Sequence, residues 1–100
     1  MHYTLRQLQV FLATAHHENI SRAAQSLSMS QSAASSALAE LENQYDIQLF
    51  DRIGKRLQLN ALGHALRPQA EALLQQAQDL DLALRQHAAT GQIKIGATLT

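Results

Sequence analysis

The stretch 61–89 constrains the fold more than any other part of the chain, because its apolar residues recur every three or four positions. That spacing is typical of an amphipathic α-helix, and Asn60 can cap such a helix. Pro68 should kink the helix rather than end it, because the apolar pattern resumes beyond it. At 1.5 Å per residue the helix would be about 43 Å long, more than a compact head of residues 1–60 can cover.

The apolar residues of this helix repeat about every 3.5 positions, as they do in helices that pair along a seam. The predicted seam consists of Leu66, Ala70, Leu73, Ala77, Leu80 and Leu84. We interpret it as the interface of a homodimer, because much of it would stay exposed to water in a monomer. The alternative is a helix that folds back on its own domain and buries the same residues there.

The composition favours a mainly α-helical chain. Leu, Ala and Gln contribute 17, 17 and 13 residues, and all three lose little side-chain freedom in a helix. Ile, Val and Thr together number 11, and one Pro and four Gly leave too few turn residues for a many-stranded barrel or sandwich. At this length a single compact head with one modest core is expected.

Residues 5–16 show the spacing of a first amphipathic helix. Its apolar stripe consists of Leu5, Leu8, Phe11, Leu12 and Ala15, and Arg6, Gln7 and Gln9 are predicted to face solvent. We therefore expect this helix to supply much of the core of the head.

Two closely linked helices are predicted next. Ser21 can cap a helix over residues 22–27, and Ser30 can cap another over residues 31–44. Only residues 28–30 separate them, and two helices joined so closely form the helix-turn-helix pattern. The pattern indicates DNA binding, but a helical corner that merely packs two helices together has the same spacing.

Residues 47–59 change character, because apolar residues flank a Gly-Lys-Arg sequence at 54–56. This arrangement predicts two short strands joined by a tight basic turn. We therefore expect a small two-stranded wing beside the helices.

The charge pattern limits how the chain can attract partners. Eight Lys and Arg balance eight Asp and Glu, so no overall attraction to nucleic acid is expected from the net charge. The one dense basic cluster is Arg52, Lys55 and Arg56.

Cysteine is absent, which excludes disulfides and thiolate metal sites. No stretch approaches the roughly 18 apolar residues of a membrane span, and we expect a cytoplasmic protein that does not contact membranes.

Nothing in the sequence indicates catalysis. His16 and His17 are adjacent, so on a helix they point about 100° apart, and no third metal ligand is spaced to join them. Neither a glycine-flanked nucleophile nor a phosphate-binding glycine loop occurs. We predict that the chain is not an enzyme and that residues 1–100 hold no cofactor or metal.

Several local motifs occur together in a characteristic order. They are Leu5-Arg6-Gln7-Leu8 with Phe11, Ser21-Arg22-Ala23-Ala24, residues 27–33, Leu41-Glu42, Leu49-Phe50-Asp51-Arg52, and Gly63 followed by Pro68. In this order and spacing the chain resembles the N-terminal domain of LysR-type transcriptional regulators. Residues 92–96 are similar to the first strand of that family's effector-binding domain.

The resemblance implies a winged helix-turn-helix over 1–60, a linker helix over 61–90 that pairs with its symmetry mate, and the start of an effector-binding domain at 91–100. It also implies a homodimer on double-stranded promoter DNA that reads an interrupted inverted repeat, with a higher homo-oligomer for the full-length protein. A small-molecule effector is expected for the C-terminal domain, which lies beyond this sequence.

Two positions depart from the family pattern. The family commonly has Pro at the position of Ser32 and often has Arg at the position of Ser36. Residues 31–39 consequently carry no charge, and the helix lacks the residue best suited to read guanine with two hydrogen bonds or to clamp a phosphate.

Short Ser and Ala side chains let this helix approach the major groove closely. Gln31 can pair with adenine, and Ala33 can touch a thymine methyl group. Ser32, Ser35 and Ser36 are predicted to bond to base edges or phosphates, and solvated helix surface is the alternative for each of them.

Phosphate contacts must come largely from outside that helix, because charge drives them. The candidates are Arg52, Lys55 and Arg56, the helix starts at Ser21 and Ser30, and Arg22 within the matching motif. Alternatively, Arg52 pairs with Asp51 or Glu42 or clamps the wing.

These patterns lead to two hypotheses. The first is sequence-specific DNA binding by a dimeric LysR-type regulator. The second is a helical dimerisation or protein-interaction module without specific DNA binding, which the neutral charge and the missing Arg favour.

Overall fold

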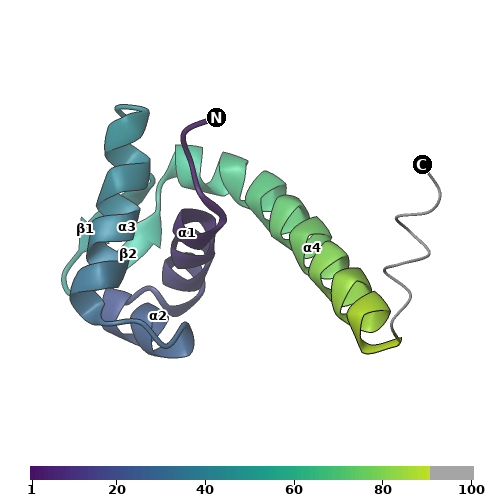
Figure 1. Cartoon of the computed structure of the whole chain (residues 1–100). Helices are drawn as coiled ribbons and strands as arrows, with labels where there is room; N and C mark the ends of the chain where they lie inside the picture. The colour runs from purple at the N-terminus through teal and green to yellow at the C-terminus, as the bar shows by residue number, and fades with distance from the viewer. Residues whose placement is uncertain (91–100) are drawn as a thin grey trace.

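The computed structural model describes the backbone of residues 1–90 and the side chains of residues 1–88. Figure 1 shows three helices and a small sheet gathered into a head, from which a fourth helix projects. The elements are α1 (Leu5–His17), α2 (Ile20–Ser26), α3 (Gln31–Gln44), β1 (Phe50–Ile53), β2 (Arg56–Leu59) and α4 (Ala61–Thr90). The predicted mainly α fold is confirmed, and the expected second domain at 91–100 lies outside the described residues.

One hydrophobic core joins the three helices of the head to β1 and to the first half of α4. Its buried residues are Leu8, Val10, Phe11, Ala15, Ala24, Ala34, Leu38, Leu41, Leu49, Phe50, Ala70 and Leu74. Phe11 and Phe50 meet edge to face with ring centroids 5.8 Å apart, which fixes the wing against α1.

The start of α1 is closed by a capping box. The hydroxyl of Thr4 accepts the Gln7 backbone N–H at 3.1 Å, and Gln7 Oε1 accepts the Thr4 N–H at 3.0 Å. Gln7 Nε2 also donates to Glu40 at 3.4 Å. The prediction that Gln7 faces solvent is therefore wrong: its side chain folds over the helix start, and the residue is only 4% exposed.

The apolar stripe of α1 is confirmed at Leu8, Phe11 and Ala15, which are buried, and at Leu12, which is half-buried. Leu5 was expected in the same stripe, but it is 46% exposed. Val10 and Thr14 are fully buried instead, so the buried side of α1 is broader than the stripe predicts.

The start of α2 differs from the prediction by two residues. Asn19, not Ser21, is the N-cap, and its Oδ1 accepts the Arg22 N–H at 3.0 Å. Ile20 therefore already belongs to the helix and packs against the core. The hydroxyl of Ser21 is left for another contact, described below.

The connection from α2 to α3 is a tight turn. Ser28 has φ +56°, and the Met29 N–H returns to the Ala24 carbonyl at 2.8 Å, which is the bonding of a Schellman helix end. Ser30 then caps α3 as predicted, because its hydroxyl accepts the Ala33 N–H at 3.1 Å. The predicted inward residues of α3, namely Ala34, Leu38 and Leu41, are all buried.

The wing has the predicted form. Strands β1 and β2 are antiparallel, with Phe50 opposite Leu59 and Ile53 opposite Arg56. Gly54 in the connecting turn has φ +62°, a left-handed conformation that glycine adopts without steric cost. Lys55 in this turn and Arg56 next to it are exposed.

Helix α4 begins as predicted, because Asn60 Oδ1 accepts the Gly63 N–H at 2.8 Å. The helix continues through Pro68 to the end of the described residues. Its predicted seam divides into two parts. Ala70 is buried, Leu66 and Leu73 are half-buried against the head, Ala77 is half-exposed, and Leu80 and Leu84 are 62% and 53% exposed.

Candidate nucleic-acid interface

Over residues 31–39 the exposed side chains of α3 are uncharged and, apart from Gln31, short. Gln31, Ser32, Ala33, Ser35 and Ser36 all lie on the surface, as the sequence predicts. The opposite face of the helix is buried in the core, so α3 has a fixed orientation in the head. Because these side chains are exposed, this face is accessible to a surface of complementary shape.

The first turn of α3 carries two further contacts. Ser30 and Ser32 place their hydroxyl oxygens 3.3 Å apart beside the helix start. The Ser21 hydroxyl, which does not cap α2, donates to Gln31 Oε1 at 2.7 Å. The structure thus brings the predicted residues Ser21, Ser30, Gln31 and Ser32 together at one end of α3.

The basic residues near this face differ in their availability. Arg22, Arg52 and Lys55 are exposed, and within the described part of the chain none of them has a carboxylate within ion-pair distance. Arg56 instead forms an ion pair with Glu18. Arg56 was predicted to act together with Arg52 and Lys55, but it differs from them because its charge is already paired.

Arg52 does not form the alternative ion pairs with Asp51 or Glu42 among the described residues. Asp51 and Arg52 lie side by side on β1 without an ion pair among the described residues, and Glu42 uses Oε2 to accept the Leu49 N–H at 2.8 Å. Arg52 instead lines a groove that lies between α3 and the wing and has a volume of about 410 Å³. Ser35 of α3 lines the same groove. The groove places an arginine next to the uncharged α3 face.

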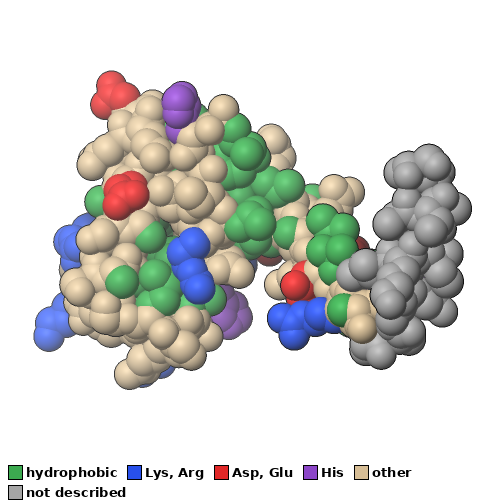
Figure 2. Space-filling view, viewed as in Figure 1, with side chains coloured by type: hydrophobic (Ala, Val, Ile, Leu, Met, Phe, Trp, Pro, Cys, Tyr) green, Lys and Arg blue, Asp and Glu red, His purple; other side chains and the backbone are tan. Residues whose placement is uncertain are grey.

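The distribution of charge is uneven despite the neutral total. Figure 2 shows Lys and Arg side chains on the left edge of the head, on the side where Figure 1 places the wing. Asp51 and Glu42 line the groove together with Arg52, so the groove carries charges of both signs. Lys55 does not line it and is exposed in the turn of the wing.

Glu18 also shapes this region, although no sequence pattern predicts a role for it there. Glu18 ends α1 with φ +55°, and its side chain reaches Arg56, 38 positions later. Because Glu18 and Arg56 are so far apart in the sequence, no local pattern predicts their contact. The only signal in the sequence is the negative charge of Glu18 at the end of a helix.

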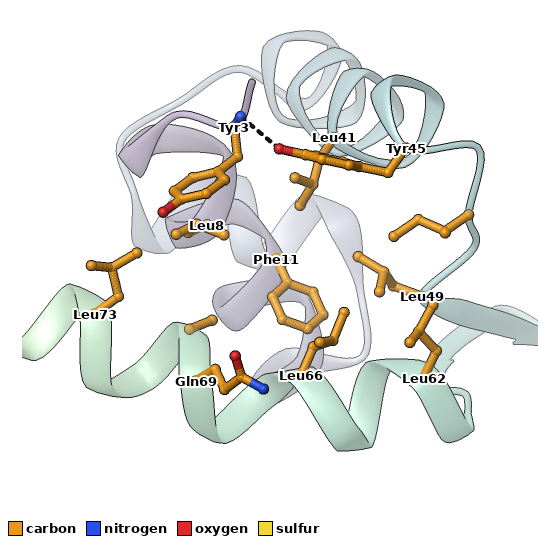
Figure 3. Close-up of a pocket in the computed structure, with 12 residues that line it drawn as sticks. Tyr3, Leu8, Phe11, Leu41, Tyr45, Leu49, Leu62, Leu66, Gln69 and Leu73 are labelled. Atoms are coloured by element: carbon orange, nitrogen blue, oxygen red, sulfur yellow. Dashed lines mark hydrogen bonds between the residues drawn. The ribbon is translucent and has the colours of Figure 1, made fainter. Parts of the chain in front are cut away.

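A second, apolar groove lies on the side of the head that faces α4. It measures about 580 Å³, and Figure 3 shows its wall side chains converging from α1, from the end of α3 and from α4. Tyr45 closes one side, where its hydroxyl accepts the Tyr3 N–H at 3.2 Å. Figure 2 shows the corresponding apolar surface between the head and α4.

No group of three or more His, Asp or Glu side chains among the described residues is arranged to hold a metal ion. No helix among those residues is both long enough and apolar enough to span a membrane.

Comparison with known proteins identifies the fold. Residues 5–64 match the family model described as bacterial regulatory helix-turn-helix protein, lysR family. The chain belongs to the LysR family. A curated relative, the HTH-type transcriptional regulator YeiE of Escherichia coli K12, is 46% identical over 100 residues, which are all of this chain and 33% of the relative. The RuBisCO operon transcriptional regulator of Allochromatium vinosum is 37% identical over 81% of this chain and 27% of its own length.

Solved structures of LysR proteins have the same architecture. The DNA complex of the CbnR DNA-binding domain matches with a TM-score of 0.74 and 30% identity, over 85% of this chain and 98% of that one. The complex of the BenM DNA-binding domain with catB site 1 DNA matches with a TM-score of 0.75 and 27% identity, over 89% and 95%. The present chain spans a third or less of the length of its curated LysR relatives.

Proposed function

We propose that this LysR-family chain binds double-stranded DNA sequence-specifically as a homodimer. The proposal is carried by the uncharged, exposed side chains of residues 31–39 on α3 and by Arg52, which lines a groove together with Ser35. Arg22 and Lys55 are exposed as well, and none of the three cations has an ion pair among the described residues. In this arrangement α3 enters the major groove and the cations contact phosphates on either side. The DNA complexes of the related CbnR and BenM domains support it.

Base reading is assigned to the exposed residues of α3. Gln31 can form two hydrogen bonds with adenine, and Ala33 can touch a thymine methyl group. Ser32, Ser35 and Ser36 supply short donors and acceptors for base edges or phosphates. Because these groups are neutral, they contribute to sequence preference rather than to salt-dependent affinity.

Phosphate binding is assigned to the exposed cations, assisted by Ser21 in the first turn of α2 and by Ser30 at the start of α3, where backbone N–H groups can contribute. Arg22, Arg52 and Lys55 would give a dimer about six phosphate contacts, and hence a slope of about −5 in the logarithm of affinity against the logarithm of salt concentration. Arg56 contributes less than the sequence predicts, because Glu18 already neutralises it.

The homodimer is supported by the apolar surface that one protomer leaves uncovered. Leu80 and Leu84 lie on one face of the projecting half of α4 and are 62% and 53% exposed. The apolar groove beside the first half of α4 adds to this surface. We assign both to the second copy of the chain, since unpartnered apolar surface of this extent is unusual in a soluble monomer.

The wider role follows from the family. We propose that the full-length protein acts in the cytoplasm as a transcriptional regulator without enzymatic activity. The region that follows α4 in its longer relatives would bind a small-molecule effector and extend the dimer to a higher homo-oligomer.

A binding experiment tests the DNA proposal. A duplex would be selected from a randomised pool with the purified chain and then titrated beside a scrambled duplex at two salt concentrations. We expect the selected duplex to bind at least about 1,000-fold more tightly at physiological salt. Absence of binding to either duplex at low salt would reject DNA binding and favour a helical interaction module. Equal binding that salt abolishes would reject sequence specificity.

A further inference from the structure

Gln69 interrupts the apolar stripe of α4 where that stripe borders the apolar groove. It lies three residues after Leu66 and four before Leu73, so the three side chains fall on one side of the helix. The predicted seam passes through Ala70 instead, but Ala70 is only 7% exposed because it packs into the head. Gln69 is exposed, and a partner that covers this turn of α4 must therefore meet its amide.

The Gln69 amide stands in uncharged and largely apolar surroundings. Of the side chains that line the apolar groove in the described part of the chain, none is charged and only Gln69 carries an amide. Among the same residues this amide has no hydrogen-bond partner, whereas Gln75 donates to Asp79 at 3.0 Å. In a single copy the Gln69 amide can bond to water. A purely apolar cover would remove that water and leave the amide unbonded, which is unfavourable.

Tyr45 adds a second hydrogen-bonding group to the wall of the groove. Its hydroxyl accepts the N–H groups of His2 and Tyr3 at 3.3 and 3.2 Å, and it still has its own hydrogen to donate. Figure 3 shows Tyr45 and Gln69 on opposite walls of the groove. The groove is therefore apolar, with hydrogen-bonding groups at two separate places.

A second copy of the chain is the occupant that this surface fits. The groove continues along α4 into Leu80 and Leu84, which are 62% and 53% exposed. Because no side chain that lines the groove is charged, two copies can approach without repulsion between like charges there. An amide both donates and accepts, so the second copy can meet Gln69 with its own Gln69 or with its Tyr45 hydroxyl.

We propose that Gln69 is a specificity-determining residue of self-association, which holds the two copies in one arrangement at a cost in affinity. The inference rests on the proposed homodimer. A single polar residue among apolar ones has this effect in other paired helices, because only some arrangements give it a hydrogen-bond partner. Arrangements that leave the Gln69 amide unbonded are disfavoured, although their apolar contacts are equally good.

Matched substitutions at Gln69 and Gln78 test the cost in affinity. Gln78 is exposed and lies nine residues further along α4, about 180° around the helix and away from the stripe. Glutamine, leucine and glutamate have similar helix propensities, so α4 itself should be unaffected. In sedimentation equilibrium Gln69→Leu should tighten the dimer about 10-fold by adding apolar contact. Gln69→Glu should weaken it at least about 10-fold by burying a charge. The same two substitutions at Gln78 should change the affinity less than about 2-fold.

A spin label measures the arrangement of the two copies. The chain has no cysteine, so Leu82→Cys supplies a single labelling site at an exposed residue outside the stripe. Pulsed electron paramagnetic resonance should give one narrow distance between the two labels of a dimer when residue 69 is glutamine. The same distance should appear with Gln78→Leu, whereas Gln69→Leu should give several distances.

The outcomes separate this inference from the proposed homodimer. A single, unchanged distance in Gln69→Leu would overturn the inference, and so would equal dimer affinities for Gln69→Leu and Gln78→Leu. Circular dichroism of each variant distinguishes lost pairing from lost folding, and the fold should be kept because Gln69 is exposed. A wild-type chain that stays monomeric would instead reject the homodimer and leave the groove to a different partner.

Discussion

Glu18 and Arg56 form an ion pair that joins the end of α1 to strand β2. The same Glu18 accepts the Leu57 N–H through its backbone carbonyl at 3.0 Å, so two adjacent wing residues are held at one point. The pair lies at the surface, with the Arg56 side chain 65% exposed and the Glu18 side chain 31% exposed. It therefore contributes little to stability, but it removes one positive charge from the wing.

Glu18→Gln should strengthen DNA binding. The substitution keeps the size of the side chain and the backbone bonds of Glu18, while it frees Arg56 to contact a phosphate. Each added contact steepens the salt dependence by about 0.9, or about 1.8 for a dimer. Titration of one duplex at several salt concentrations measures this slope, and the loss of stability should stay below about 1 kcal/mol.

Two substitutions in the wing complete this comparison. Lys55→Ala removes a charge that has no ion pair among the described residues, and it should make the slope shallower by about 0.9 per protomer, whereas Arg56→Ala should change it less. If Lys55→Ala and Arg56→Ala reduce the slope equally, and Glu18→Gln leaves it unchanged, Glu18 does not neutralise Arg56 on DNA.

Local signals explain what could be predicted from the sequence. The cap at Ser30, the three-and-four spacing of Ala34, Leu38 and Leu41, and the glycine at 54 each depend on neighbouring residues, and the structure has α3 and the wing as expected. The exposed residues of α3 follow from the same spacing.

Competing local choices and distant contacts explain which features could not be predicted from the sequence. Both Asn19 and Ser21 are good caps, and spacing alone did not show that Asn19 fits better. Gln7 is buried because its amide turns back on Thr4. The pairing of Arg56 with Glu18 depends on the path of the chain across 38 positions.

Gly63→Ala should destabilise the fold by about 1 to 3 kcal/mol. Gly63 lies where α4 begins, and an added Cβ would overlap the carbonyl oxygen of Leu49 and lie 2.7 Å from Leu59 Cδ2. Backbone at Leu49 cannot move easily, because its carbonyl also accepts the Asn60 N–H at 3.0 Å. Urea unfolding measures the loss.

The matched control for helix propensity is Ala65→Gly, at an exposed position of the same helix. It should cost about 1 kcal/mol through propensity alone, whereas Gly63→Ala improves propensity and should still destabilise. A Gly63→Ala variant as stable as the wild type would show that α4 does not approach Leu49 this closely.

Thr14→Val should leave the stability unchanged or raise it by up to about 1 kcal/mol. Thr14 is fully buried in α1, and within the described part of the chain its Oγ1 has no hydrogen-bond partner. Valine has the same shape without the cost of burying an unbonded hydroxyl. Thermal unfolding would compare it with Thr14→Ser, which keeps the hydroxyl and loses a methyl group. A loss of more than about 1 kcal/mol in Thr14→Val would indicate that the hydroxyl is bonded.

The regular spacing of α4 does not reveal that its apolar stripe has two different environments. Leu66 and Leu73 pack against the head of the same chain, as in the alternative of a helix folded back on its own domain. Leu80 and Leu84 continue the stripe beyond the head and are exposed. The sequence repeat is the same in both halves, because either environment requires an apolar side chain every three or four residues.

Leu80→Asp should dissociate the dimer without unfolding the head. Leu80 is 62% exposed in one protomer, so an aspartate there meets water in the monomer but an apolar partner in the dimer. Leu73 is unsuitable for this test because its substitution would also disturb the core. Leu82 provides the matched control: it is 56% exposed but lies about 200° around the helix from Leu80, outside the stripe. Analytical ultracentrifugation should show monomers for Leu80→Asp and dimers for Leu82→Asp, and an identical sedimentation profile for both would show that the stripe is not the interface.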